Sequence, residues 1–163
     1  MIRSLLDQLP QLNLSVSATT RRPRPGEADG VDYRFLTDQD FDRRVAAGEF
    51  AEWAEYSGRR YGTLCSELER TPILLEIEVQ GARQIRRTAP EAVQIFIAPP
   101  SLEALRTRLV GRGTDAPEEV ERRLRVAEEE LSAASEFGHV VVNDRLEDAV
   151  LQVAGIVRGT LDP

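Results

Sequence analysis

Three arginines in a proline-rich loop are the first side chains of this sequence that could do chemistry. Arg21, Arg22 and Arg24 stand close together. Pro23 and Pro25 stiffen the backbone between them. A guanidinium is a planar fork that matches pairs of phosphate oxygens, and a stiff loop positions it at a low entropic cost. The loop is therefore a candidate phosphate site, although a solvated basic loop explains the composition about equally well.

Two tyrosines and a glutamate could extend such a site toward a phosphorylated base. Tyr33 and Tyr61 could each donate a hydroxyl hydrogen bond to the same anion, while half-buried strand aromatics are the simpler interpretation of each. Glu52, beside Trp53, carries a carboxylate that could accept two N–H bonds from the edge of a guanine. A solvent-facing carboxylate on an alternating strand is the alternative for Glu52.

A pair of carboxylates follows an apolar run in the middle of the chain. Glu76 and Glu78 flank Ile77 where a buried strand is expected to end. Ligands of open α/β sheets bind beyond the carboxyl ends of the parallel strands. The pair could therefore hold Mg²⁺ with its water shell, or a substrate. Two strand-end charges without a function are the weaker interpretation, because the preceding run should be buried.

A second basic group surrounds a glycine-flanked break. Arg108, Arg112 and Arg123 lie near Gly111 and Gly113, which suggests a mobile element. An arginine carried by a lid can neutralise charge on a transferring phosphoryl group. The alternative is a set of helix-surface arginines paired with neighbouring glutamates.

The overall composition narrows the chemistry further. The chain has 163 residues and a net charge of −7, which fits one globular domain and disfavours nucleic acid as a partner. All 21 basic residues are arginine, so no lysine is available for a Schiff base or a phosphate loop. Cys65 and His139 are single, so an internal disulfide, a Cys-rich zinc site and a His–His metal pair are excluded. No apolar run is long enough to span a membrane, and we expect a cytoplasmic protein.

Alternating strands and helices are predicted to position these side chains. Helices are predicted at 2–9, 38–47, 80–87, 101–110, 117–136 and 146–157, with a short one capped by Thr63 and ending before Pro72. Strands are predicted at 14–18, 33–36, 73–77, 92–97 and 140–142, with a hairpin over 50–61. This alternation predicts an α/β fold with a mostly parallel sheet and helices on both faces. Residues 19–62 break the rhythm and are expected to form a small strand-rich insertion.

The residues discussed so far fall within or beside seven short segments. These are Ser15–Glu27, Glu52–Ala54, Arg60–Thr63, Val79–Ala82, Ala98–Ser101, Gly111–Thr114 and Val142–Asp144. In residue types, order and spacing, the set resembles the signatures of guanylate kinases along nearly the whole chain. The first segment is long and specific, and it resembles the GMP-binding signature of that family.

The resemblance implies the fold of a P-loop nucleoside monophosphate kinase. This would be a single domain over 1–163 with a five-stranded parallel sheet flanked by helices, a GMP-binding subdomain at 19–62 and a short lid at about 108–123. The implied reaction, a step of purine metabolism, transfers a phosphoryl group from ATP to GMP and gives ADP and GDP, with Mg²⁺ as cofactor. The resemblance implies no nucleic-acid or membrane partner, and the sequence leaves the oligomeric state open.

The resemblance also implies a role for each matching residue. Arg21, Arg24, Tyr33 and Tyr61 match the clamp on the GMP phosphate, whereas Ser17, Glu52, Thr63 and Glu78 match contacts to guanine and its surroundings. Glu76 matches the acidic residue of the Mg²⁺ environment. Arg108, Arg112 and Arg123 match the lid and phosphoryl-transfer arginines, and Asn143 with Arg112 matches the ATP contacts.

Three departures from the family pattern leave alternatives open. The Walker A phosphate loop and the central strand before it are absent, because the chain begins inside the helix that follows that loop in the family. Glu78 stands where the family usually has Asp, and the stretch between Thr63 and Ile73 is several residues short.

Without the loop we expect the chain as written to be inactive as a kinase. It would be a guanylate kinase whose sequence starts too late, a non-catalytic module that binds GMP or a phosphopeptide, or a decayed fragment. Retention of Arg112, Arg123 and Asn143 favours the kinase, since a pure binding module would not need them.

Overall fold

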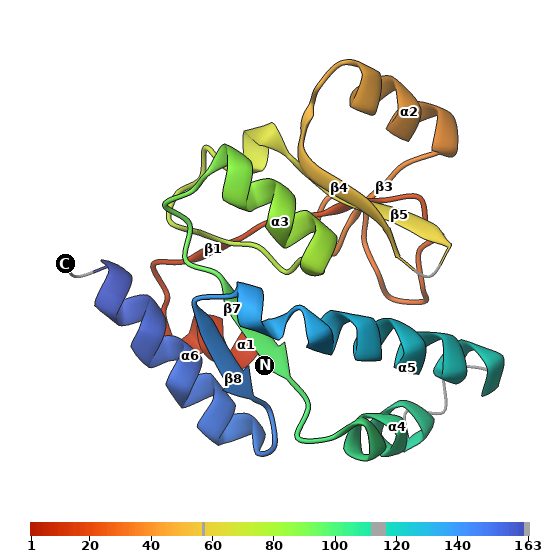
Figure 1. The fold of residues 1–163 in the computed structure, drawn as a ribbon. Helices are drawn as coiled ribbons and strands as arrows, with labels where there is room; N and C mark the ends of the chain where they lie inside the picture. Colours follow the sequence, from red (N-terminus) through yellow and green to blue (C-terminus); the bar gives the residue numbers. More distant parts are fainter. Residues whose placement is uncertain (57, 112–116, 162–163) are drawn as a thin grey trace. The chain divides into compact units, whose positions relative to one another are not determined.

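The computed structural model describes residues 1–56, 58–111 and 117–161, and it forms two compact units (Figure 1). One unit is Pro10–Ala92, and the other combines Met1–Leu9 with Val93–Pro163. The helices are α1 (Ile2–Gln8), α2 (Asp38–Ala46), α3 (Val79–Thr88), α4 (Leu102–Gly111), α5 (Pro117–Ser132) and α6 (Leu146–Leu161). The strands are β1 (Asn13–Leu14), β2 (Ala18–Thr19), β3 (Arg34–Phe35), β4 (Phe50–Tyr56), β5 (Arg59–Leu64), β6 (Ile73–Leu74), β7 (Ile95–Ala98) and β8 (His139–Val142).

A four-stranded sheet with the order β3-β2-β5-β4 organises the Pro10–Ala92 unit. β4 and β5 form the predicted hairpin, with Gly58 in the left-handed region at φ 71°. β2 pairs antiparallel with β5 and parallel with β3. Helix α3 packs against β4 in this unit. The same unit also holds the parallel pair β1–β6. These contacts show that residues 18–64 contain several paired strands, and they leave β4 at one edge of its sheet.

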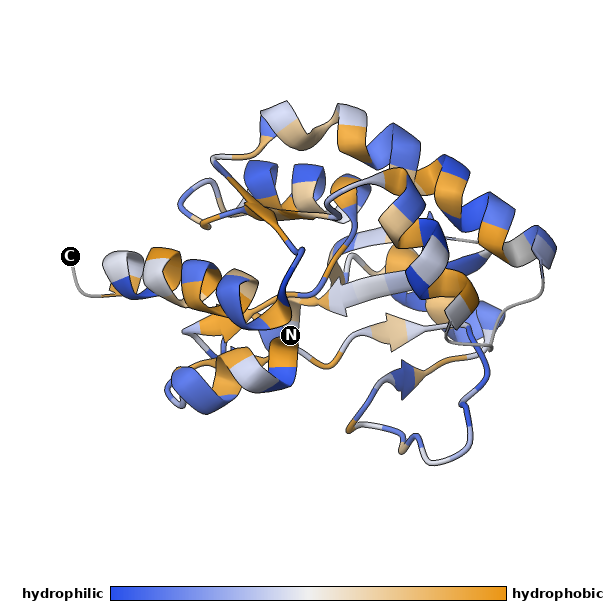
Figure 2. Cartoon of the chain, turned by 90° about the horizontal axis from the view of Figure 1, so that it is seen from below, coloured by the Kyte–Doolittle hydropathy of each residue, from blue (hydrophilic) through white to orange (hydrophobic). Residues whose placement is uncertain are grey.

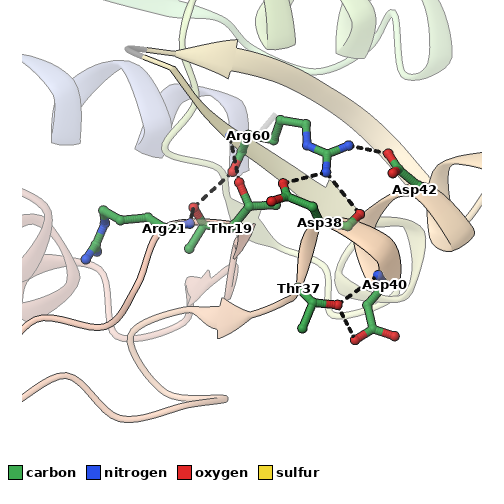
Figure 3. A network of polar contacts seen from close by, with 8 residues as sticks. Thr19, Arg21, Thr37, Asp38, Asp40, Asp42 and Arg60 are labelled. Carbon is green, nitrogen blue, oxygen red and sulfur yellow. Dashed lines mark hydrogen bonds and ion pairs between the residues drawn. The ribbon is translucent and has the colours of Figure 1, made fainter.

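Helix α2 is fastened at its first turn by side chains, as its sequence predicts. Thr37 is the N-cap, and its Oγ1 accepts a hydrogen bond from the Asp40 backbone N–H at 3.0 Å. Arg60 on β5 donates to Asp38 at 2.8 Å and pairs with Asp42 (Figure 3). Its guanidinium carbon also lies 4.7 Å from the centre of the Phe41 ring. Gly48, at φ 68°, ends the turn after the helix.

A close approach of backbones fixes the hairpin beside this helix. A Cβ added to Gly62 would lie 2.8 Å from the Glu52 carbonyl oxygen and 2.8 Å from Trp53 Cβ. Both atoms belong to the neighbouring strand and cannot move without separating the hairpin. Position 62 therefore requires glycine for packing.

The other unit is built on the parallel pair β7–β8. Helix α6 packs against β8 and α1, and α4 packs against α5 through Leu109, Val120 and Leu124. Orange and blue residues alternate around the helices in Figure 2, which is the pattern of amphipathic helices with one buried face. No helix in the described residues is long and apolar enough to cross a membrane.

The α/β class and the flanking helices are confirmed, whereas several predicted boundaries were wrong. Thr63 lies inside β5 and not at a helix N-cap, and only a 3₁₀ turn at Cys65–Glu67 follows it. The strand predicted at 73–77 is paired only over Ile73–Leu74, opposite Asn13–Leu14. The strand predicted at 14–18 is divided between β1, which ends at Leu14, and β2, which begins at Ala18. The resemblance implies one five-stranded parallel sheet. In its place the described residues contain two separate two-stranded parallel sheets, β1–β6 and β7–β8.

Three further boundaries differ by a few residues. Strand β7 starts at Ile95 rather than near residue 92, α5 ends at Ser132 before a second 3₁₀ turn, and α6 continues to Leu161. Helix and strand ends depend on local pairing, so apolar pattern alone places them only approximately.

Candidate functional site

Arg21 is held in place by a carboxylate and two aromatic rings. Its Nη1 and Nη2 donate to Glu27 at 2.9 and 2.8 Å in a fork-to-fork pair. The guanidinium carbon lies 5.1 Å from the centre of the Tyr33 ring and 5.8 Å from that of Phe35. The hydrogen bond with Glu27 raises the pKa of Arg21, and Tyr61 adds to this effect. Arg21 is therefore a fixed, fully charged donor.

The two tyrosines lie together beside this arginine. Tyr33 and Tyr61 pack edge to face with ring centres 6.2 Å apart. Burial is the main cause that raises the pKa of the Tyr33 hydroxyl, and the negative charge of Glu76 adds to it. Arg21, Tyr33 and Tyr61 thus lie together. Their N–H and O–H groups can bind an anion with several oxygens.

Arg24 and Ser17 lie in the same unit with fewer contacts. The Arg24 backbone N–H donates to Glu27 at 2.7 Å, while the residue itself is exposed. The Ser17 carbonyl accepts a hydrogen bond from the Arg34 backbone N–H at 2.9 Å. The guanidinium of Arg24 can therefore reach a ligand without first leaving a buried partner.

Glu52 is buried, against the expectation of a typical strand carboxylate. Its exposed fraction is 4%, whereas the adjacent Trp53 is 38% exposed. Burial raises the pKa of the Glu52 carboxyl, hydrogen bonds with Thr63 oppose this, and the charge of Glu78 adds to the rise. A buried carboxylate of this kind is completed by a ligand that brings N–H donors.

The strand register brings the anion-binding group and Glu52 to one face of the sheet. Tyr61 and Thr63 are two residues apart on β5 and so point to the same side. Glu52 on β4 pairs with Thr63. Two residues of a strand span about 7 Å. An anionic group at Tyr61 and an N–H edge at Glu52 can therefore belong to one small molecule.

Glu78 and α3 complete this side of the site. Glu78 is the N-cap of α3, and its carboxylate accepts hydrogen bonds from the N–H groups of Gln80 and Gly81, both at 2.6 Å. The longer side chain of Glu, compared with the Asp usual in the family pattern, is thus used to cap the helix. The cap places a negative charge at the positive end of α3.

The other unit holds the remaining predicted residues. Arg108, near the end of α4, donates to the carbonyls of Asn143 and Asp144 at 2.7 and 2.9 Å. Asn143 directly follows β8, at the carboxyl end of the β7–β8 pair, and its N–H donates to the Ala98 carbonyl at 2.7 Å. Arg123 is half-buried on α5. Arg112 lies outside the described residues.

Comparisons with known proteins agree with this geometry. The guanylate kinase family model matches residues 1–160. A guanylate kinase of Rubrobacter xylanophilus is 50% identical over 163 residues, covering 97% of this chain and 85% of the relative. That of Streptomyces coelicolor is 51% identical over 152 residues, covering 90% and 77%. The crystal structure of guanylate kinase from Anaplasma phagocytophilum superposes with a TM-score of 0.81 at 32% identity, covering 98% of this chain and 82% of that one.

The chain belongs to the guanylate kinase family. The recognition made from the seven segments is confirmed, and so is the fold class. The roles of the individual residues are not tested by these similarities and are taken up below as proposals.

The sequence implied Mg²⁺ as a cofactor alongside ATP, and the residues present could supply one or two of its ligands. No group of three or more His, Cys, Asp or Glu side chains in the described part of the chain forms a metal-binding cluster. Mg²⁺ is commonly held by one or two carboxylates together with waters and nucleotide phosphates. The exposed Glu76 beside Tyr33 is suited to that role.

Three residues of this guanylate kinase family member gain a role only from the structure. Glu27 pairs with Arg21, and Gly81 lies against the Glu52 carboxylate. Glu67 is buried and accepts bonds from the Val16 N–H, Arg34 and Arg70 at 3.0 to 3.1 Å. Burial alone would raise the pKa of Glu67, but these three donors lower it. The position of Glu27 six residues after Arg21, across a proline-glycine turn, is the one signal that sequence reasoning could have used.

Proposed function

We propose that the chain binds GMP in the Pro10–Ala92 unit and is a guanylate kinase, whose reaction transfers a phosphoryl group from ATP to GMP and gives ADP and GDP; this transfer requires a Walker A loop in addition to the residues present here. The observation that carries this proposal is the placement of Arg21, Tyr33 and Tyr61 on the same sheet face as the buried Glu52. One end of such a site attracts phosphate and the other end attracts N–H donors. GMP carries both groups.

The phosphate of GMP is bound by the arginine and tyrosine group. Arg21 and Arg24 supply the charge, and the hydroxyls of Tyr33 and Tyr61 donate neutral hydrogen bonds. Both Nη atoms of Arg21 donate to Glu27, which holds the guanidinium in place before the phosphate binds. A charged fork fixed before binding loses little entropy on contact.

The guanine base is bound at Glu52. A carboxylate there accepts the N1–H and 2-amino groups of guanine. Thr63 lies beside it, and Thr63 and Ser17 supply further polar contacts. Adenine presents no N1–H and no 2-amino group, so AMP leaves the buried carboxylate without partners. Glu78 contributes through α3, whose first turn it caps.

The ATP side and the transfer step belong to the other unit. ATP is contacted by Asn143 and Arg112. The charge of the phosphoryl group during its transfer is neutralised by Arg108, Arg112 and Arg123. Glu76 would hold Mg²⁺ through its water shell, and the metal would supply positive charge to the nucleotide phosphates. No side chain acts as a nucleophile, since the phosphate of GMP attacks directly. We retain 19–62 as the GMP-binding subdomain and about 108–123 as the lid, and the cytoplasmic location stays a prediction.

Calorimetric titration with two arginine variants tests the phosphate end. We expect Arg21→Ala to weaken GMP about ten- to hundredfold, because a charge-assisted hydrogen bond contributes about 1.5–3 kcal/mol. Arg22→Ala is the matched control, since it removes the same charge from the exposed neighbour in the same loop. Guanosine, which lacks the phosphate, should bind equally to all three proteins. Equal GMP affinity in Arg21→Ala and the parent would remove this loop from the site.

Product formation separates the kinase from a binding module. GDP formation from ATP and GMP is followed for residues 1–163, where we expect none because the sequence has no Walker A lysine, and for a form extended by a Walker A segment, where we expect GDP. Tight GMP binding without any GDP in the extended form would favour the non-catalytic alternative. Equal binding of AMP and GMP would contradict the role of Glu52.

A further inference from the structure

Gly81 lies directly under the carboxylate of Glu52. A Cβ added to this glycine would be 2.5 Å from Glu52 Oε2, 3.1 Å from Glu52 Cδ and 3.2 Å from Glu78 Oε1. A Cβ atom does not approach another heavy atom outside its own chain neighbours more closely than 3.0 Å. Any residue other than glycine here would therefore push the Glu52 carboxylate from its place.

The atoms that would move identify the role of this glycine. The three nearest neighbours of the added Cβ all belong to the two carboxylates. At Gly62, by contrast, the neighbours include the backbone carbonyl of Glu52 and the Cβ of Trp53. A side chain at position 62 would part the hairpin, whereas one at position 81 would displace the tip of a side chain. Gly81 thus acts on the position of a carboxylate rather than on the fold.

Helix α3 also holds the strand that carries Glu52. Gln84 Nε2 donates to the Trp53 carbonyl at 2.7 Å, and Gln84 Oε1 accepts from the Trp53 N–H at 3.2 Å. One side-chain amide thereby satisfies both backbone groups of the residue next to Glu52, on the edge strand β4. Gly81 and Gln84 are one helical turn apart, so a single face of α3 fixes both the strand and the carboxylate.

We propose that Gly81 is a specificity-determining positioning residue, which sets the Glu52 carboxylate where it contacts the 2-amino group of a guanine base. Gln84 supports it by fixing the backbone of β4. This inference rests on the proposed GMP site. It adds that helix α3, through Gly81, positions the Glu52 carboxylate. The site therefore prefers purine monophosphates that carry both the N1–H and the 2-amino group over those that carry only the N1–H.

Binding of GMP and IMP to Gly81→Ala tests the inference, because IMP lacks only the 2-amino group. In the parent we expect GMP to bind about ten- to hundredfold more tightly than IMP, the worth of one charge-assisted hydrogen bond. In Gly81→Ala this ratio should fall to within about threefold, through weaker GMP binding with IMP changed little. Gly155→Ala is the control, since that glycine in α6 has open space around it, and it should keep the parent ratio.

The same titrations separate this inference from the proposed site. If Glu52→Gln keeps the parent ratio, the assignment of Glu52 to guanine is wrong. If Glu52→Gln abolishes the ratio and a folded Gly81→Ala keeps it, only the role of Gly81 is overturned. If Gly81→Ala loses its cooperative thermal transition, Gln84→Ala decides: a reduced ratio supports positioning by α3, and an unchanged ratio overturns it.

Discussion

Burying a carboxylate without a cationic partner is costly, and Glu52 is buried with no ion pair to it among residues 1–56, 58–111 and 117–161. Its neighbours are Thr63, Gly81 and the second carboxylate of Glu78. Removal from water disfavours the charged form, and a nearby like charge disfavours it further. The Glu52 carboxylate, which we propose contacts guanine, thus destabilises the folded protein while the site is empty. A ligand with two N–H donors offsets that cost, which links binding to stability at a single residue.

Glu52→Gln should stabilise the empty protein at neutral pH while weakening GMP. The folded pKa of Glu52 is raised above its unfolded value, so its favourable contribution is present in acid and is lost as pH rises through the folded pKa. The melting temperature of the variant should therefore exceed that of the parent by a margin that grows from pH 4.5 to pH 8. Differential scanning calorimetry across this range measures the margin. A margin that shrinks with rising pH would contradict the burial of a charge at this position.

At the scale of elements, short-range polar contacts secure the parts that surround the site. Helix α2 is capped by Thr37 and tied to β5 by Arg60. Helix α3 is capped by Glu78 and tied to β4 by Gln84. Each helix thus has an N-cap at its first turn and a side-chain contact that attaches it to the sheet. The sheet face bearing Tyr61 and Thr63 is positioned by these attachments together with the hairpin.

Thr37→Ala should lower the free energy of unfolding by about 1 kcal/mol, the usual effect of losing a hydroxyl N-cap. The Asp40 N–H would lose its acceptor at the first turn of α2. Thr37→Ser keeps the hydroxyl and is the control, with an expected change of only a few tenths of a kcal/mol. Urea denaturation followed by circular dichroism measures both. Equal midpoints for the Ala and Ser variants would show that the cap does not contribute.

At the scale of the whole molecule, the proposed substrate residues divide between the two compact units. Those assigned to GMP lie in Pro10–Ala92, and Arg108, Arg123 and Asn143 lie in the other unit. Each unit has its own parallel strand pair and its own helices. The division therefore gives each nucleotide its own structural unit.

Saturating GMP should slow backbone amide exchange mainly within Pro10–Ala92. A ligand that binds only the folded form suppresses local opening of the segments it contacts. Strand β5 should show the largest effect, since it carries Tyr61 and Thr63, and β8 should change little. Hydrogen-exchange mass spectrometry with and without GMP measures this, with guanosine as the ligand that lacks the phosphate. Equal protection of both units would contradict the assignment of GMP to one of them.

Much of the architecture follows from local signals in the chain. The cap at Thr37, the stop at Gly48 and the turn at Gly58 were predicted because each depends on residues within one turn of the backbone. The long helices follow from apolar periodicity in the same way. The family, with its fold and its set of matching residues, is likewise readable from ordered segments of the sequence.

Tertiary structure alone decided which groups meet and which strand residues pair. Alternation along β4 shows that Glu52 and Trp53 face opposite sides, but only the packing of α3 decides that Glu52 is the buried one. Thr63 was predicted as a helix cap because its type permits one, and pairing with Glu52 placed it in a strand instead. The contact between Gly81 and the Glu52 carboxylate involves residues that are 29 positions apart in the sequence. Such contacts depend on how distant segments pack, which no signal confined to neighbouring residues can determine.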